Sequence, residues 1–592
     1  MNKPKFIRLP AGRLCLPVLL AACLMGTEAQ AAVPDSMAWM TAPLSGGSSS
    51  AGTAGSSGGS SSAGETGSSG GSFSAGKAGS SGGSSFAGKT ASSGGEELPS
   101  WMTGTLSVQT EEPGGDLNRG PVYRFATDRF LWNVENTMPA SFSWISLGKK
   151  PTVKSQGALG TCWAISATSA MEAALLPERS EVFSADHLSL SNGFTITQNE
   201  GGDYYMIMSY LADWKGPVLE SQDPYGDGKT VSVPDAAVHV QEIRLLKGMS
   251  QARIKEMIVR FGPVQSSLCM DRTKTDSAAQ ACYSVENSAY FDPVQETLNH
   301  DICVLGWDDS YPKERFATVP EEDGAWICQN TWGEDFGEDG IFYVSYEDAN
   351  LFRKGGIAYT DVEDADNYDH VYEQDTLGWQ ARQGYGVDSA YFAGVFEIPG
   401  AGELSDGEDE AGADADGGGQ QAQTELSDGG SEAVADADAA GAGGQVLSAV
   451  GFYATGPSTA YQVYLIRDFQ GVQDLEDLKH ELRGGPSSGG AGAEDRKADA
   501  IAQGWLEHPG YFTVRTDTLL PLSPGERYAV AVFVDTMNGT RPVAVEMAKD
   551  VYTQNVTLEG RETYISPDGQ AWERTQTVYG TNACLKVYTK DE

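Results

Sequence analysis

The chemistry in this sequence centres on one cysteine. The stretch 156–176 (QGALGTCWAISATSAMEAALL) joins a glycine-containing turn to a predicted helix with apolar spacings of three and four residues, and Pro177 ends that helix. Cys162 therefore lies in the first helical turn, where unpaired backbone amides and the positive end of the helix dipole favour a thiolate over a thiol. We expect a reactive sulfur; helix position alone leaves open a small buried cysteine as the alternative.

Two downstream stretches supply partners for this sulfur. The segment 298–307 (LNHDICVLGW) places His300 at the start of a predicted strand, and the segment 326–333 (WICQNTWG) places Asn330 at the end of another. A cysteine nucleophile needs an imidazole to take its proton and a third group to hold that ring in one tautomer. We therefore predict a triad in which these two residues serve Cys162.

The three residues in this order resemble the papain-like cysteine peptidases. His300 follows Cys162 by 138 residues, within the roughly 130–150 residues usual in that family, and Asn330 follows it by 168, somewhat beyond that range. The resemblance implies that Gln156 and the Cys162 amide hold the oxyanion, and that Trp332 shields the bond between histidine and asparagine from water.

The resemblance also implies where substrate binds. Gly201 and Gly202 match the paired glycines whose backbone lies along the substrate, and FGPVQSS at 261–267 matches the start of a family strand. Asn299 is a further candidate for the cleft lining, with an ordinary strand-end residue as the alternative. We interpret His187 as non-catalytic.

Two departures from the family pattern stand close to the nucleophile. Leu159 occupies the place of a cysteine that usually forms a disulfide, and Thr161 replaces the common Ser or Ala. Neither change touches a proton-transfer group, so we expect an active enzyme.

The elements that position these residues suggest an α+β fold. Predicted helices come first and predicted strands later, which fits two lobes with a cleft between the Cys162 helix and the His300 strand. The helices are expected at 162–176, 203–214 and 250–260, and the strands at 264–269, 302–307, 325–330 and 340–346. The papain-like catalytic domain is expected to span 138–360.

Residues 361–592 have a different sequence pattern. Short alternating segments rich in Val, Tyr and Phe, separated by turn residues, predict an all-β sandwich. LGW at 377–379, SPDGQAW at 566–572 and the final CLKVYT resemble the lectin-like domain that follows papain-like domains in some bacterial and archaeal surface proteins. A carbohydrate ligand follows by analogy alone. The aromatic candidates for stacking on a sugar, with core positions as the alternative, are Trp379, Tyr385 and Tyr391.

The N-terminal part is typical of an exported protein. Residues 1–31 have the basic start, short apolar run and small-residue cleavage site of a signal peptide, and the run is too short for a membrane span. An overlapping lipobox at Cys23 offers lipid tethering as the alternative to release, and we expect release. A Gly/Ser-rich repeat linker at 32–103 and a lead-in or short pro-segment at 104–137 follow.

The charge is strongly acidic and unevenly distributed. The 592 residues carry a net charge of −42, which argues against nucleic acid or an anionic membrane as a partner. The insert 401–445 holds 12 Asp or Glu and no Lys or Arg, and it repeats ELSDG and ADAD at a period of 22. Because it lacks the calcium-loop spacing, we interpret it as a solvated spacer. Residues 484–500 predict an extended surface loop.

The cysteines leave redox chemistry open. Of eight, Cys15 and Cys23 lie in the leader. The pairs Cys269 with Cys282 and Cys303 with Cys328 are compatible with disulfides or with buried thiols. No Cys or His spacing is typical of a zinc site, and we expect neither metal nor cofactor.

These inferences combine into one expected function. We expect a secreted or cell-surface cysteine endopeptidase that hydrolyses protein or peptide substrates through a Cys-His-Asn triad and an acyl-enzyme. The sandwich would contact a surface glycan or protein, and a membrane only through lipidated Cys23. The alternative from another class is a surface adhesin or glycan-binding protein with a vestigial peptidase lobe.

Overall fold

The computed structural model describes residues 138–231, 235–270, 282–400, 444–476, 478 and 500–592. These residues all belong to one of the two units into which the chain divides. The expected signal peptide, repeat linker and lead-in lie outside the described residues, as do 401–443 and 479–499 of the two inserts.

The helices of the first half agree with the sequence patterns. The predicted helices are observed as α2 (Cys162–Leu175), α4 (Tyr204–Ala212) and α5 (Gln251–Phe261). A further short helix, α3 (Ala185–Leu190), was not predicted; Ser184 caps it by accepting a hydrogen bond from the His187 amide. No helix in the described part of the chain combines the length and apolarity needed to cross a bilayer.

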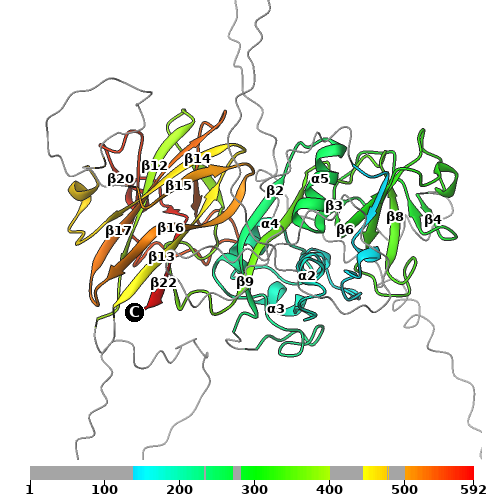
Figure 1. The fold of residues 1–592 in the computed structure, drawn as a ribbon, viewed down its shortest axis with the longest axis horizontal. Coiled ribbons are helices and arrows are strands. Elements are labelled where there is room, and N and C mark those ends of the chain that lie inside the picture. The colour runs from blue at the N-terminus through cyan, green and yellow to red at the C-terminus, as the bar shows by residue number, and fades with distance from the viewer. Residues whose placement is uncertain (1–137, 232–234, 271–281, 401–443, 477, 479–499) are drawn as a thin grey trace, which may run out of the picture. The chain divides into compact units, whose positions relative to one another are not determined.

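Helix α2 lies at the centre of the catalytic half. Every residue of it except Ala174 is buried, so it is covered on all sides rather than amphipathic. It packs against α3 and α4 and against strands of the sheet (Figure 1). Its many alanine and serine side chains allow this close approach. Burial on all sides fixes the helix start, and with it the sulfur of Cys162.

The strands of the catalytic half form a largely antiparallel sheet. β6 is buried at every residue but its last and pairs with β3 on one side and with β7 on the other. The four predicted strands are confirmed, and β2 and β9 were not predicted. The strands are β1 (Ser141–Ser143), β2 (Val238–Leu246), β3 (Val264–Leu268), β4 (Tyr283–Ser284), β5 (Ala289–Tyr290), β6 (His300–Asp308), β7 (Ala325–Gln329), β8 (Ile341–Ser345) and β9 (Gly356–Asp364).

The second half is the predicted β-sandwich. A six-stranded sheet, β15-β14-β17-β12-β19-β20, packs on the row β10-β22-β13-β16 through a buried core that includes Phe392 and Phe452. The strands are β10 (His370–Glu373), β11 (Ala381–Gln383), β12 (Ser389–Glu397), β13 (Gln445–Ala454), β14 (Thr459–Ile466), β15 (Ala502–Leu506), β16 (Gly510–Leu522), β17 (Arg527–Thr536), β18 (Val543–Glu546), β19 (Thr563–Ser566), β20 (Glu573–Arg574), β21 (Asn582–Ala583) and β22 (Leu585–Asp591).

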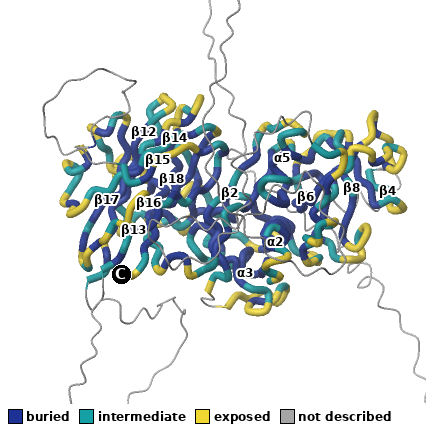
Figure 2. The backbone as a smooth tube through the Cα atoms, in the orientation of Figure 1, coloured by how far each residue is buried: buried dark blue, intermediate teal, exposed yellow. Residues whose placement is uncertain are grey.

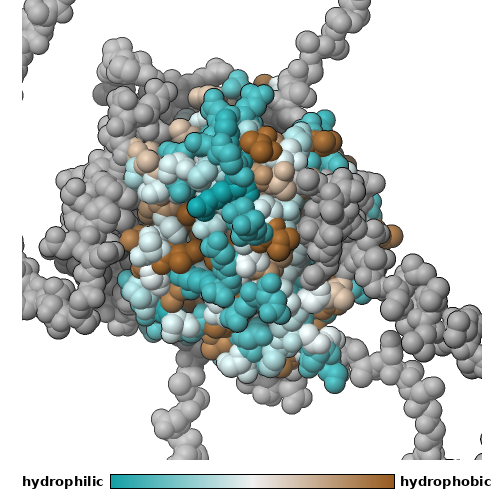
Figure 3. Space-filling view, turned by 90° about the vertical axis from the view of Figure 1, so that its right-hand side faces the viewer, coloured by the Kyte–Doolittle hydropathy of each residue, from teal (hydrophilic) through white to brown (hydrophobic). Residues whose placement is uncertain are grey.

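Burial follows this two-part organisation. Buried backbone runs through the middle of each half, and exposed backbone is concentrated at loops (Figure 2). On the face beside β4 and β8, hydrophilic residues form a band with hydrophobic residues beside it in small groups (Figure 3). A mixed surface of this kind is ordinary for a protein face in contact with water.

One sheet continues from the catalytic half into the sandwich. β16 pairs with β2 in the register Gly510 to Arg244 and Phe512 to Glu242, and β2 pairs with β9. Gly510 is required here, because a Cβ at that position would lie 1.9 Å from the Ile243 carbonyl oxygen. The expected boundary at 360/361 falls inside β9, so that strand belongs to both segments of chain.

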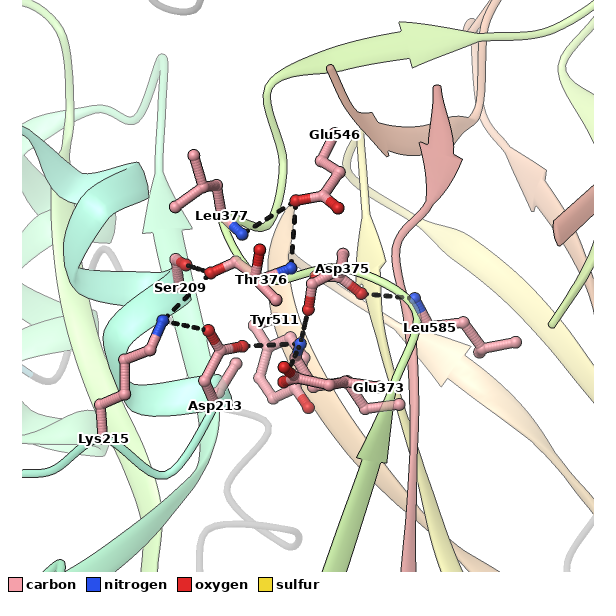
Figure 4. Close-up of polar contacts among 12 residues, drawn as sticks. Ser209, Asp213, Lys215, Glu373, Asp375, Thr376, Leu377, Tyr511, Glu546 and Leu585 are labelled. Atoms are coloured by element: carbon pink, nitrogen blue, oxygen red, sulfur yellow. Dashed lines mark hydrogen bonds and ion pairs between the residues drawn. The ribbon is translucent and has the colours of Figure 1, made fainter. Parts of the chain in front are cut away.

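A buried lysine joins the two halves next to this sheet. Lys586 of β22 lies 2.6 Å from Asp213, which caps the C-terminal end of α4, and 3.2 Å from both Glu373 and Asp375 (Figure 4). We call these four residues the Lys586 cluster. Lys215 adds a second cation, 2.8 Å from Asp213. The cluster thus crosses from the catalytic half to the sandwich.

An aromatic contact supports the same junction. The Trp214 ring stacks on His239 of β2 at 3.9 Å and on Tyr588 of β22 at 5.2 Å between centroids. Aromatic pairs of this geometry contribute about 0.5–1.5 kcal/mol beyond their buried area. The junction therefore combines strand pairing, a buried ion cluster and stacked rings.

We predict that Lys586→Met destabilises the protein strongly. Removing a cation that contacts three carboxylates leaves most of the buried negative charge uncompensated, and breaking a buried ion pair typically costs about 3–5 kcal/mol. Urea unfolding would measure this loss, with Lys590→Met on the same strand as the matched control. Equal midpoints for the two variants would contradict the prediction.

We predict that the free energy of unfolding depends on pH through Glu373. Burial raises the pKa of Glu373 to about 7 from its ordinary value of 4.5, and the Asp213 carboxylate adds to this effect. The folded state therefore binds this proton more tightly, and the group's contribution to stability is lost as pH rises from about 4.5 to about 7. In Glu373→Gln the free energy of unfolding should fall less across that window than in wild type. Parallel urea titrations at both ends of the window would measure the difference, and equal slopes would refute it.

Candidate active site

Cys162 is the first residue of α2, as predicted, and is buried. The turn before it is held by the Gly160 amide, which donates to the Gln198 carbonyl at 2.8 Å. A Cβ on Gly160 would lie 3.0 Å from that same oxygen, so the tight turn favours glycine.

His300 and Asn330 lie together. His300 begins β6, Asn330 follows β7, and the two strands pair side by side. His300 Nε2 lies 2.8 Å from Asn330 Oδ1. The Thr331 amide donates to that same Oδ1 at 2.7 Å, which identifies the atom as the acceptor. The imidazole therefore donates from Nε2, and Nδ1 is the nitrogen that can accept a proton.

Trp332 covers this pair. Its ring lies 4.9 Å from the His300 ring, centroid to centroid, and 5.1 Å from the Phe336 ring. Its position fits the shielding role that the sequence resemblance implied, because an apolar ring reduces access of water to the hydrogen bond.

The sulfur of Cys162 lies at the start of β6. The backbone amide of Asp301, the residue after His300, is one of the groups that act to lower the pKa of the Cys162 thiol. Helix α2 also contacts β6 directly. The structure therefore brings the end of α2 that carries the sulfur to the strand end that carries the imidazole.

Burial at the helix start opposes the thiolate that helix position favours. Burial raises the pKa of Cys162 well above its ordinary value, and the Asp301 carboxylate raises it further. Backbone amides of Asp301, Trp163 and Cys162 itself act in the opposite direction but do not outweigh burial. A thiolate at this position therefore needs a nearby cation, and the helix start by itself is insufficient.

Gln156 is buried and tied to both sides of the site. Its Oε1 accepts from the Thr331 hydroxyl at 2.6 Å, and its Nε2 donates to the Leu159 carbonyl at 2.6 Å. The Gln156 amide donates to the Thr331 carbonyl at 2.8 Å. Gln156 thus links the turn before Cys162 to the segment after Asn330.

The glycine pair has a packing role that the sequence did not reveal. Gly201 has a φ of +90°, which favours glycine. A Cβ on Gly202 would lie 2.2 Å from the Trp163 ring, so this backbone lies directly against α2.

Two other residues have structural partners. Asn299 Oδ1 accepts from the Met270 amide at 2.8 Å, which favours the strand-end interpretation over cleft lining. His187 is buried with its Nδ1 2.7 Å from the Tyr210 hydroxyl, and burial lowers its pKa to about 4. His187 is therefore held in its neutral form in α3.

Buried polar residues beside the site were missed. Asp301 is buried, and its Oδ2 accepts from Gln265 Nε2 at 2.7 Å. Asp203 caps α4, and burial raises its pKa to about 6. The sequence contained a signal for Asp301, because it is a charged residue next to an apolar run. Its partner Gln265 could not be predicted, because it lies 36 residues away.

The six described cysteines are free, so neither proposed disulfide forms. Cys303 and Cys328 lie on neighbouring strands, and burial raises the pKa of each thiol. One group of possible metal ligands, Cys269, Asp292 and Glu296, exists among the described residues. The Cys269 thiol donates to Glu296 at 3.3 Å, a contact that needs no ion.

The sandwich aromatics are largely internal. Trp379 is buried and packs edge-on against Tyr205 of α4 at 5.2 Å, so it belongs to the junction between the halves. Tyr391 is also buried, and Tyr385 donates to Glu573 at 3.0 Å. Trp379 and Tyr391 therefore occupy the core positions that were the alternative to sugar stacking.

Comparison with known families agrees with this architecture. Residues 138–361 match the family model of the papain family cysteine proteases, and residues 439–589 match that of the lectin-like domain. The chain therefore combines a papain-family cysteine protease domain with a lectin-like domain.

Particular relatives resemble the catalytic part. Cathepsin S of Bos taurus is 26% identical over 221 residues, which cover 36% of this chain and 62% of that protein. Cysteine proteinase 1 of Zea mays is 27% identical over 233 residues, which cover 37% and 59%. The chain thus spans about three fifths of the length of these curated relatives.

Solved structures share the two-part fold. The cysteine protease and lectin-like domains of Cwp84, a surface layer associated protein of Clostridium difficile, align with a TM-score of 0.55 at 21% identity, covering 77% of this chain and 90% of that one. Clostridial Cwp84 after propeptide cleavage aligns with a TM-score of 0.57 at 21% identity, covering 76% and 99%. This likeness concerns the fold.

We predict that Asp301→Asn lowers the pKa of Cys162. The substitution keeps the shape of the side chain and removes the charge that disfavours the thiolate. The rate of Cys162 alkylation by iodoacetamide, followed by peptide mass, should therefore rise at lower pH than in wild type. Asp348→Asn is the matched control, because that buried carboxylate acts on Cys328. Superimposable profiles for wild type and Asp301→Asn would contradict the prediction.

Proposed function

We propose that this protein is an exported cysteine endopeptidase that hydrolyses peptide bonds with Cys162 as nucleophile, His300 as general acid and base, and Asn330 as the residue that orients the ring. The observation that carries the proposal is the bond of His300 Nε2 to Asn330 Oδ1, which leaves Nδ1 as the proton acceptor at the strand end where the sulfur lies.

The raised pKa of Cys162 shapes the mechanism. Because the buried thiol does not ionise by itself, its proton must pass to His300 Nδ1, and the resulting imidazolium pairs with the thiolate. The thiolate then attacks the peptide carbonyl carbon. The carbonyl oxygen becomes negative, and the Cys162 amide and Gln156 Nε2 are the donors available to stabilise it.

The rest of the cycle uses the same imidazole, which now carries the proton taken from the thiol. His300 donates it to the leaving amine, and the peptide bond breaks to leave an acyl group on the Cys162 sulfur. Water then loses a proton to His300 and attacks the acyl carbon, which releases the acid and restores the thiol. Asn330 keeps the imidazole plane in place during both transfers.

Export and a surface location are proposed on two grounds. The first is the signal peptide predicted at 1–31, and the second is the shared fold with Cwp84, which is described as surface layer associated. The sandwich is proposed to contact a glycan or protein at that surface. The predicted gly-ser linker and the alternative lipid tether at Cys23 would set its distance from the membrane.

A surface adhesin with an inactive catalytic half is the rival function. The presence of Cys162, His300, Asn330 and Gln156, and the bond between His300 and Asn330, favour the enzyme. A vestigial lobe would not need a buried imidazole held by an asparagine under a tryptophan ring.

We predict that Cys162→Ala abolishes hydrolysis of an unstructured protein such as casein and labelling by a thiol-directed epoxide. The reason is loss of the sulfur that the proposal assigns as the nucleophile. Cys282→Ala, which removes a half-buried thiol elsewhere, is the matched control and should retain activity. Gel-based cleavage and mass spectrometry would measure both effects.

The same variant separates the rival functions. Hydrolysis retained by Cys162→Ala would eliminate the peptidase assignment. A wild-type protein with no hydrolysis at all, whose Cys162→Ala variant binds a glycan array as tightly as wild type does, would favour the adhesin.

A further inference from the structure

Gln265 connects the two segments that carry the candidate nucleophile and base. It is the second residue of β3 and is completely buried. Its Nε2 donates to the Trp163 carbonyl at 3.0 Å and to Asp301 Oδ2 at 2.7 Å. Trp163 follows Cys162 in α2, and Asp301 follows His300 in β6. One amide group therefore contacts the residue after each reacting side chain.

The orientation of this amide is fixed from its other end. Tyr359 of β9 donates its hydroxyl to Gln265 Oε1 at 2.7 Å. A reversed amide would turn its oxygen towards the Trp163 carbonyl and the Asp301 carboxylate, and acceptor would then face acceptor. Both donors and the acceptor of Gln265 are thus used, as burial of an amide requires.

We propose that Gln265 is a positioning residue that sets the separation of Cys162 and His300 for proton transfer. The inference rests on the proposed peptidase function. It adds a residue that neither the triad nor the oxyanion site includes, and one that acts only through its neighbours.

The topology explains why such a link is needed. β3 and β6 are paired, with Ser267 opposite Asp301, so the ladder already fixes the histidine strand relative to β3. Helix α2 lies outside that ladder and is held by side-chain packing. The bond from Gln265 to the Trp163 carbonyl joins the helix start to the sheet. A displacement of about 1 Å between reacting groups can cost about 10²-fold in rate.

The Gln265 side chain also affects the ionisation of Asp301, whose carboxylate acts on Cys162. Burial raises the pKa of Asp301, whereas the bonds from Ser267 and Gln265 and the charge of Lys354 favour its ionised form. Loss of the Gln265 donor would therefore leave Asp301 neutral over a wider pH range. Its effect on Cys162 would weaken, and the thiol would ionise at lower pH.

The test compares full-length wild type with Gln265→Met, which keeps the approximate volume of the side chain and removes both donors. We expect kcat to fall by about 10²-fold with KM little changed, because substrate binding does not involve this residue. We also expect the acid limb of the kcat profile to move to lower pH. A purely structural role would reduce the active fraction without moving that limb.

Two further variants keep the test decisive. Gln241→Met removes another buried glutamine, on β2, and should keep the wild-type kcat and pH limb. Tyr359→Phe removes only the hydroxyl that orients the Gln265 amide, and should lower kcat in the same direction by a smaller factor. If Gln265→Met does not fold, Tyr359→Phe carries the test, and an unchanged kcat in that variant would overturn the proposal.

A second measurement does not depend on proteolysis. Alkylation of Cys162 by iodoacetamide against pH reports the sulfur alone. If wild type hydrolyses no peptide, the proposed function fails, yet a shifted profile in Gln265→Met would still support the link. Folded Gln265→Met with wild-type kcat and a wild-type alkylation profile would overturn the inference while leaving the peptidase assignment intact.

Discussion

The structure depends on the contact between the start of α2 and the start of β6. Each element is ordinary by itself, and their contact brings the helix end that carries Cys162 to the strand that begins with His300. Burial of α2 on all sides holds the helix, and the pairing of β6 with β3 and β7 holds the strand. The bonds of Gln265 and Gln156 join these elements across the site.

Burial at this contact has opposite effects on structure and chemistry. It excludes water and lets short hydrogen bonds fix the ring of His300. It also raises the pKa of Cys162, so the helix start alone does not ionise this sulfur. The proposed mechanism therefore takes the stabilisation of the thiolate from the imidazole of His300 rather than from the helix dipole alone.

The lectin-like half is integrated with the catalytic half through backbone and charge. β16 continues the sheet through β2, and the Lys586 cluster lies next to that pairing. The strand β2 has no close sequence neighbour in the sandwich, so its pairing with β16 could not be predicted from local patterns. Trp379 illustrates the consequence, because an aromatic suited to a sugar platform instead packs on Tyr205.

The sequence by itself determined the elements with strong local patterns: the helix after Cys162, the strands at His300 and before Asn330, and the sandwich strands, because periodicity and turn residues act over short distances. Only the tertiary structure decided which buried groups meet. Three features depend on contacts between distant segments: the pairing of Asp301 with Gln265, the short helix α3, and the free state of Cys303 and Cys328. The pKa of Cys162 belongs to the same class, since burial is a property of the folded chain and outweighs the effect of the amides at the helix start.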